Sequence, residues 1–185
     1  MAAAQPIIPI RYNGLGFEPA EHFPEDDAET FLRGVPVMLN GDGHLIEVPD
    51  ELGSSELILG FSAEVAHNLA TAGTPETGNE HGSPQNQPNA VTTAIGSPVK
   101  TGLCGVYRAS ADVHYRVPLA DGQTFTQTLV ENATRYKIDK AGNGYWCVDS
   151  TDTGTDAKHV WLIRGVDPNN DEFVICKLVA AAIAG

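Results

Sequence analysis

The residue types that most often carry chemistry are present in this chain, but their spacing matches no catalytic or metal-binding motif. The six histidines, at positions 22, 44, 67, 81, 114 and 159, include no pair four residues apart and no HExxH pattern. His67, followed by Asn68, is the histidine of most interest, and we expect a capping or loop contact there. No serine lies in a GxSxG pattern and no Gly-Lys-Ser/Thr sequence is present, so neither a nucleophile elbow nor a phosphate loop is predicted.

The acidic segment 149–156 comes nearest to a metal-binding motif. Calcium requires several carboxylate and carbonyl oxygens. An EF-hand loop beginning at the first of these acids would place Gly154 correctly. Its third and fifth positions are, however, Thr151 and Thr153, and its twelfth is Val160. Charge is missing where the ion needs it, so a polar hairpin loop is predicted. We therefore expect no metal, no cofactor, no catalytic residue and no enzymatic activity.

The cysteines also favour a structural role. Cys104, Cys147 and Cys176 are far apart, odd in number and set among apolar or aromatic neighbours, so we expect small buried hydrophobic side chains. No CxxC spacing suggests zinc. The chain starts without the basic and apolar pattern of a signal peptide, and no apolar run reaches a membrane-spanning length. These features predict synthesis in a reducing cytoplasm and no membrane partner.

Acidic residues are concentrated in the first half of the chain. Residues 1–99 contain 14 acidic and 2 basic side chains, whereas residues 100–185 contain 10 and 9, which together give the net charge of −13. Such a surplus of negative charge argues against nucleic acid as a partner. The densest run, residues 18–29, is either a solvated face or a docking surface for a basic partner.

Short strands are the elements that must position these residues. Runs rich in Val, Ile, Thr, Tyr and Trp recur between turns that contain glycine, which predicts a mainly β domain, a small β-barrel or sandwich, over residues 31–185. A short helical turn is expected near residues 65–70, and Tyr145, Trp146 and Trp161 are expected in the core. The predicted strands are Val35–Leu39, His44–Val48, Leu57–Phe61, Gly102–Arg108, Thr124–Leu129, Arg135–Ile138, Gly144–Val148, His159–Gly165 and Glu172–Val179.

Two segments fall outside this pattern. Residues 1–30 contain four prolines, each of which removes a backbone donor, so neither a long helix nor a central strand is expected there. Large apolar residues recur between the prolines, and we interpret the segment as an extended N-terminal arm that lies on its own domain or on a neighbour. Residues 73–98 are rich in Gly, Pro, Asn and Thr and are predicted to form a long loop of the functional or partner-ordered kind.

Several of these strands and turns carry a resemblance to a known family. GVPVMLNGDGHLIEV, LILGFSAEVAHNLAT, ATRYKIDKAGNGYWCVDST and HVWLIRGVDPNNDEFVICKLV, within residues 32–72 and 133–180, are similar to the head decoration (capsid cement) proteins of tailed bacteriophages. The resemblance implies a compact β domain bound to the outside of the major capsid protein lattice. It also implies a homo-oligomer, a trimer or dimer at a lattice symmetry axis, and reinforcement of the head against internal pressure.

The resulting expectation is a non-enzymatic structural virion protein on the outer capsid surface, whose partners are the major capsid protein and itself. We expect the inter-subunit contacts to come from apolar arm residues, with the loop 73–98 second. Two alternatives stay open: another virion component, such as a tail tube or head–tail connector subunit, and a glycan-binding β module that uses Tyr107, Tyr115, Tyr145, Trp146 and Trp161. The predicted arm contacts are Ile7, Ile8, Ile10, Tyr12 and Phe17.

Overall fold

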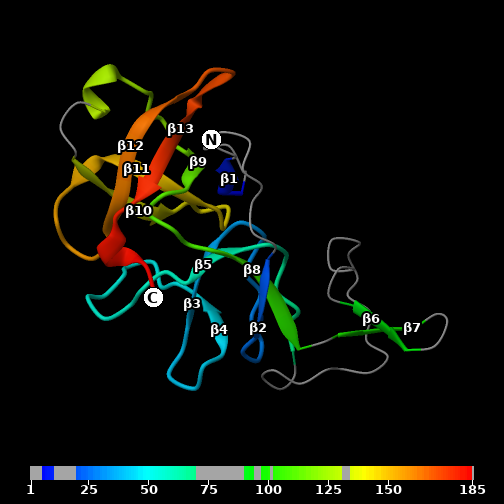
Figure 1. Cartoon of the computed structure of the whole chain (residues 1–185). Coiled ribbons are helices and arrows are strands. Elements are labelled where there is room, and N and C mark those ends of the chain that lie inside the picture. The colour runs from blue at the N-terminus through cyan, green and yellow to red at the C-terminus, as the bar shows by residue number, and fades with distance from the viewer. Residues whose placement is uncertain are drawn as a thin grey trace.

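Two antiparallel β-sheets packed against each other make up the fold (Figure 1). This computed structural model describes residues 6–10, 20–69, 90–93, 97–100, 102–130 and 134–184. The first sheet contains, in spatial order, β1 (Ile8–Ile10), β9 (His114–Pro118), β13 (Asn170–Leu178), β12 (His159–Asp167), β10 (Arg135–Lys140) and β11 (Trp146–Thr153). The second contains β2 (Glu21–Pro24), β8 (Leu103–Arg108), β5 (Gly60–Ser62), β3 (Pro36–Leu39) and β4 (Leu45–Glu47).

The sheet order distinguishes between the two β architectures that the sequence allowed. The first sheet ends at β1 and β11, and the second ends at β2 and β4, so neither sheet closes on itself. A barrel abolishes such edges. The mainly β prediction is confirmed, because strands make up 49% and helix 4% of the described structure. The architecture is a sandwich and not a closed barrel.

Aromatic side chains from both sheets meet at the centre of the sandwich. Phe61 of β5 lies 4.8 Å from Tyr115 of β9 and 6.0 Å from Trp161 of β12, measured between ring centroids. All three residues are buried. Trp146 is buried as expected, and its indole N–H donates to Glu47 Oε1 of the opposite sheet at 2.7 Å, whereas Tyr145 is only half-buried.

Most predicted strands are present, but three assignments along the chain are wrong. The segment predicted as a strand over Thr124–Leu129 instead holds the 3₁₀ turn η2 (Gln127–Leu129), which buries no side chain. A strand in a sandwich needs one buried face, and no side chain from 124 to 129 is fully buried. The helical turn expected near residues 65–70 is absent from residues 65–69, and Asn68 there adopts a positive φ of 52°. The strand β9 was missed, because charged residues and Pro118 mask its alternation.

The Asn40–Gly43 turn forms as predicted and joins β3 to β4. Asn40 N donates to His44 O at 2.9 Å, and the Asn40 side chain accepts from the backbone amides of Asp42 and His44. Gly43 has a φ of 81°, a conformation that glycine adopts without steric cost. Local turn chemistry therefore fixes the register of this hairpin.

The N-terminal arm, residues 1–30, and the predicted loop, residues 73–98, both contain strands that the sequence did not predict. In the described part of the arm, β1 and β2 are strands, each at the edge of its sheet, as the prolines require. Residues 73–89 and 94–96 of the predicted loop lie outside the described residues. The rest of it contributes to a hairpin in which β6 (Ala90–Thr93) pairs with β7 (Ser97–Lys100), and Figure 1 shows this hairpin apart from the two larger sheets.

Candidate functional site

The arm residues predicted to contact a partner have different environments. Ile7 is 2% exposed and belongs to the core, and its backbone N–H donates to Gly34 O at 3.2 Å. The Ile8 side chain points outward and is 44% exposed, and Ile10 is half-buried. Tyr12 and Phe17 lie outside the described residues. Among the predicted contact residues that the structure describes, Ile8 is therefore the side chain most available for a contact.

Strand β1 holds Ile8 at one edge of the first sheet. It pairs with β9 through Ile8 opposite Arg116, Pro9 opposite Tyr115 and Ile10 opposite His114. Pro9 cannot donate a backbone hydrogen bond, so the outer edge of this three-residue strand is poorly suited to receive an added strand. A partner would be contacted through the Ile8 side chain.

A rigid polar group lies on β9 beside this strand. Arg116 Nε donates to Asp167 Oδ2, and its guanidinium carbon lies 3.5 Å above the centre of the Phe173 ring. The hydrogen bond from Arg116, followed by one from the backbone of Asn169, lowers the pKa of the Asp167 carboxyl. The Arg116 guanidinium is held both by the Asp167 carboxylate and by the Phe173 ring, so it forms a fixed part of the surface next to Ile8.

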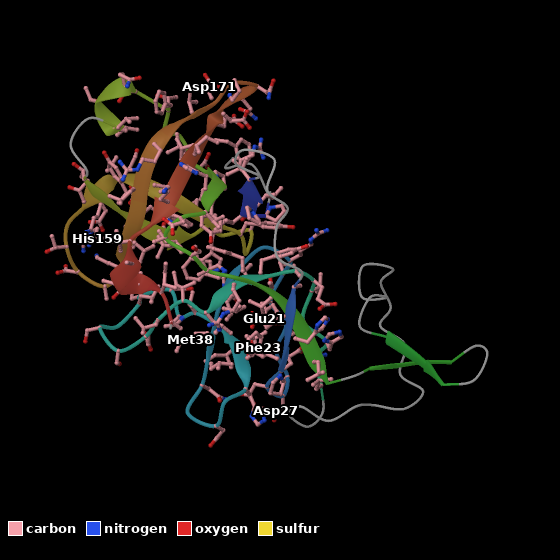
Figure 2. All side chains as sticks on the ribbon, viewed as in Figure 1. Glu21, Phe23, Asp27, Met38, His159 and Asp171 are labelled. Carbon is pink, nitrogen blue, oxygen red and sulfur yellow. The ribbon has the colours of Figure 1, made fainter. Side chains whose placement is uncertain are left out.

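His67 is buried and paired with Glu25, whereas the sequence predicted a capping or loop contact. Both it and Glu25 are almost completely buried, at 1% and 0% exposure. Glu25 Oε1 accepts from the His67 backbone N–H at 2.6 Å, and Glu25 Oε2 lies 2.6 Å from His67 Nδ1. The pair ties the segment after β2 to the segment after β5. Glu25 belongs to an acidic run that resembles a solvated face, so the sequence carried no signal for it. Figure 2 shows its neighbours Glu21, Phe23 and Asp27 along the same segment.

A second buried carboxylate lies close to this pair. Glu64 is 4% exposed, and its Oε1 accepts a hydrogen bond from the backbone of Gly105 on β8. Burial raises the pKa of the neighbouring Cys104 thiol, and the charges of Glu64 and Glu25 raise it further. A thiol with a raised pKa is a poor nucleophile at neutral pH. This buried cluster therefore serves to hold β2, β5 and β8 together.

The other cysteines are equally inert, which gives a direct test of the packing. All three are buried, burial raises the pKa of Cys147 to about 12, and burial holds that of Cys176 well above its usual value. Because thiolate forms only as the pH approaches these values, we expect no reaction of the native protein with dithiobis-nitrobenzoate at pH 8 within minutes. In denaturant all three thiols should react. A thiol that reacts rapidly in the native protein would contradict this packing.

The acidic segment 149–156 is engaged in contacts within the fold. Asp149 Oδ1 accepts from Thr151 and from the Gln123 amide at 2.7 Å each. Asp152 lies 2.9 Å from His159 Nε2 and 3.2 Å from Lys158 Nζ, and these two hydrogen bonds lower the pKa of its carboxyl. Within the ranges that the structure describes, no three His, Cys, Asp or Glu side chains form a group suited to a metal ion.

The five aromatic residues considered as a glycan platform do not share a surface. Tyr115, Trp146 and Trp161 are each 1% exposed or less, and Tyr107 and Tyr145 are half-buried. Stacking on a sugar requires an accessible ring face, so the three buried rings are unavailable for it. This arrangement gives no support to the glycan-binding alternative.

Comparisons with known proteins provide no family or relative. No family model, no curated protein and no solved structure matches the chain. No helix in the described ranges is long and apolar enough to cross a membrane. A functional proposal for this chain therefore depends on its own residues.

Proposed function

We propose that the chain is a structural virion protein that binds the outer surface of the major capsid protein lattice and reinforces the head. The observation that carries the proposal is the placement of the arm: Ile7 is anchored in the core, which leaves Ile8 exposed at the edge of the first sheet. A decoration protein has to present such a fixed apolar contact to a neighbour. Many weak contacts of this kind, repeated over a lattice, add up to strong binding.

Two further features support the proposal. The segments that resemble phage decoration proteins contain β3, β4 and β5 of one sheet and β10 to β13 of the other, so they belong to both layers of the sandwich. The net charge of −13 suits an outer surface that is held away from packaged nucleic acid. The proposed location is the outer capsid surface of the virion, and the proposed partners are the major capsid protein and further copies of the chain.

A point substitution tests the proposal better than removal of the arm. Deleting residues 2–20 would also remove Ile7 from the core, so the melting temperature would fall whether or not the arm binds a partner. We expect Ile8→Asp to keep the fold and to weaken binding to undecorated phage heads about tenfold or more, because it replaces an apolar contact by a charge. Co-sedimentation at increasing protein concentration measures the affinity and the stoichiometry.

The matched control is Leu39→Asp on β3. Leu39 is 36% exposed and lies in the other sheet, so this variant makes the same change of charge and polarity elsewhere. Saturable binding that Ile8→Asp weakens and Leu39→Asp leaves unchanged would support the proposal. Equal weakening by both variants would remove Ile8 from the contact. No binding to heads, with assembly of the pure protein into rings or tubes, would favour a tail or connector subunit instead.

A further inference from the structure

A groove of about 430 Å³ crosses the first sheet at the end where β10 begins and β13 finishes. Arg135, Leu162 and Lys177 occupy one row of cross-strand neighbours on β10, β12 and β13. The adjacent row, Tyr136, Trp161 and Leu178, is buried in the sandwich, so the Arg135 row faces outward by strand alternation. Arg164, two residues beyond Leu162 on β12, lines the same groove.

The charge of this groove is opposite to that of the rest of the molecule. Nine Lys or Arg side chains are described, and five of them form ion pairs with carboxylates. Of the four described without such a pair, only Arg33 lies elsewhere, and the other three line the groove. None of the described residues that line it is Asp or Glu. In a chain with 24 acidic and 11 basic side chains, three uncompensated cations have therefore been brought together.

The groove also has an apolar component. Leu162 and Val179 contribute to its lining, and Ala111 and Ala180 add small side chains. The neighbouring His114 is affected by the same charges: burial lowers its pKa, and Lys177 and Arg164 lower it further. A ligand that matches this lining needs negative groups on either side of an apolar group.

These features favour an acidic protein segment over a nucleic acid. The net charge of −13 repels a long polyanion at a distance, whereas two or three carboxylates can be bound locally within the screening length of about 10 Å. Strands lie about 4.8 Å apart, so Arg135 and Lys177 are separated by roughly 10 Å across Leu162. In an extended peptide, alternate side chains lie about 6.8 Å apart on one face, so the two acids on either side of an apolar residue are about 13.6 Å apart. The flexible Glu, Arg and Lys side chains can close the difference from the roughly 10 Å between the two cations.

We propose that this groove binds an extended acidic segment of another protein, with carboxylates on Arg135, Arg164 and Lys177 and an apolar side chain on Leu162. Arginine binds carboxylates through two parallel hydrogen bonds, which gives the contact direction as well as strength. This inference does not depend on the virion proposal, because Ile8 is not among the residues that line the groove and the test uses no phage component.

The probe is the peptide acetyl-Glu-Ser-Leu-Ser-Glu-amide, titrated into the full ¹⁵N-labelled chain. We expect saturable shifts of the amide signals of Arg135, Leu162 and Lys177, and binding at least tenfold weaker for the matched peptide with Gln in place of Glu. We also expect Arg164→Gln combined with Lys177→Gln to weaken binding at least tenfold. Arg33→Gln combined with Lys158→Gln removes the same charge elsewhere and should leave the affinity unchanged.

Three results would overturn the proposal. The first is equal affinity for the Glu and Gln peptides. The second is binding of inorganic tripolyphosphate at the groove while the Glu peptide does not bind, which would identify a phosphate site. The third is association between copies of the chain that the groove variant abolishes and that an excess of the Glu peptide leaves intact. Unfolding midpoints of all variants identify any that fail through misfolding.

Discussion

Glu25→Ala is expected to lower the free energy of unfolding by about 3–5 kcal/mol, because it leaves His67 buried without its carboxylate partner. Glu25 and His67 exchange two contacts of 2.6 Å at almost zero exposure, so water cannot replace either one. Small domains are stable by only about 5–15 kcal/mol, and the melting temperature should therefore fall by roughly 6–20 °C. Urea unfolding and calorimetry measure both quantities.

The control for this prediction is Glu21→Ala on β2, the strand that immediately precedes Glu25. Glu21 is exposed and lies 3.9 Å from Arg108, a surface ion pair whose loss should cost about 1 kcal/mol or less. The double variant Glu25→Leu with His67→Leu should be less destabilised than the sum of the two single leucine variants, because neither polar group is then left alone in the core. A change below about 1 kcal/mol for Glu25→Ala would show that this pair does not hold the fold together.

Gly34→Ala is expected to displace the N-terminal segment from the core. Gly34 has a φ of 78°, and an added Cβ would lie 2.2 Å from Pro6 Cβ, so residues 6–10 must move. Strain in the left-handed conformation costs about 1–2 kcal/mol, and exposure of Ile7 costs roughly 1.5–3 kcal/mol more. We expect a total loss of about 2.5–5 kcal/mol in the free energy of unfolding, with faster amide exchange in β9.

The control variant Gly122→Ala distinguishes backbone strain at a positive φ from displacement of the N-terminal segment. Gly122 has the same φ of 78°, but no atom lies within 4 Å of the position that an added Cβ would take, so this variant carries the conformational cost alone. Amide exchange at His114 to Arg116, the residues that β1 covers, should accelerate only in Gly34→Ala. If the two variants lose the same stability and exchange alike, the contact between Pro6 and Gly34 contributes nothing to docking of the arm.

The sequence did not predict which of the arm residues are buried and which are exposed. The described part of the arm contains the extended backbone that was expected, but all five predicted residues were treated alike as partner contacts. The structure places Ile7 in the core and Ile8 on the surface. Successive residues of a strand face opposite sides, so which isoleucine is buried depends on the sheet to which β1 pairs. That pairing, with β9 about a hundred residues away along the chain, has no local signature.

The sequence by itself determined the mainly β class, the Asn40–Gly43 turn, the burial of the cysteines and the exclusion of the arm from central strands. Each depends on local properties: alternation, positive φ at glycine, apolar neighbours, and the missing donor of proline. Only the tertiary structure decided that Glu25 meets His67, 42 residues away, and that Arg135, Arg164 and Lys177 share one groove. These groupings follow from cross-strand register, which depends on how whole sheets pair and pack and not on any single segment.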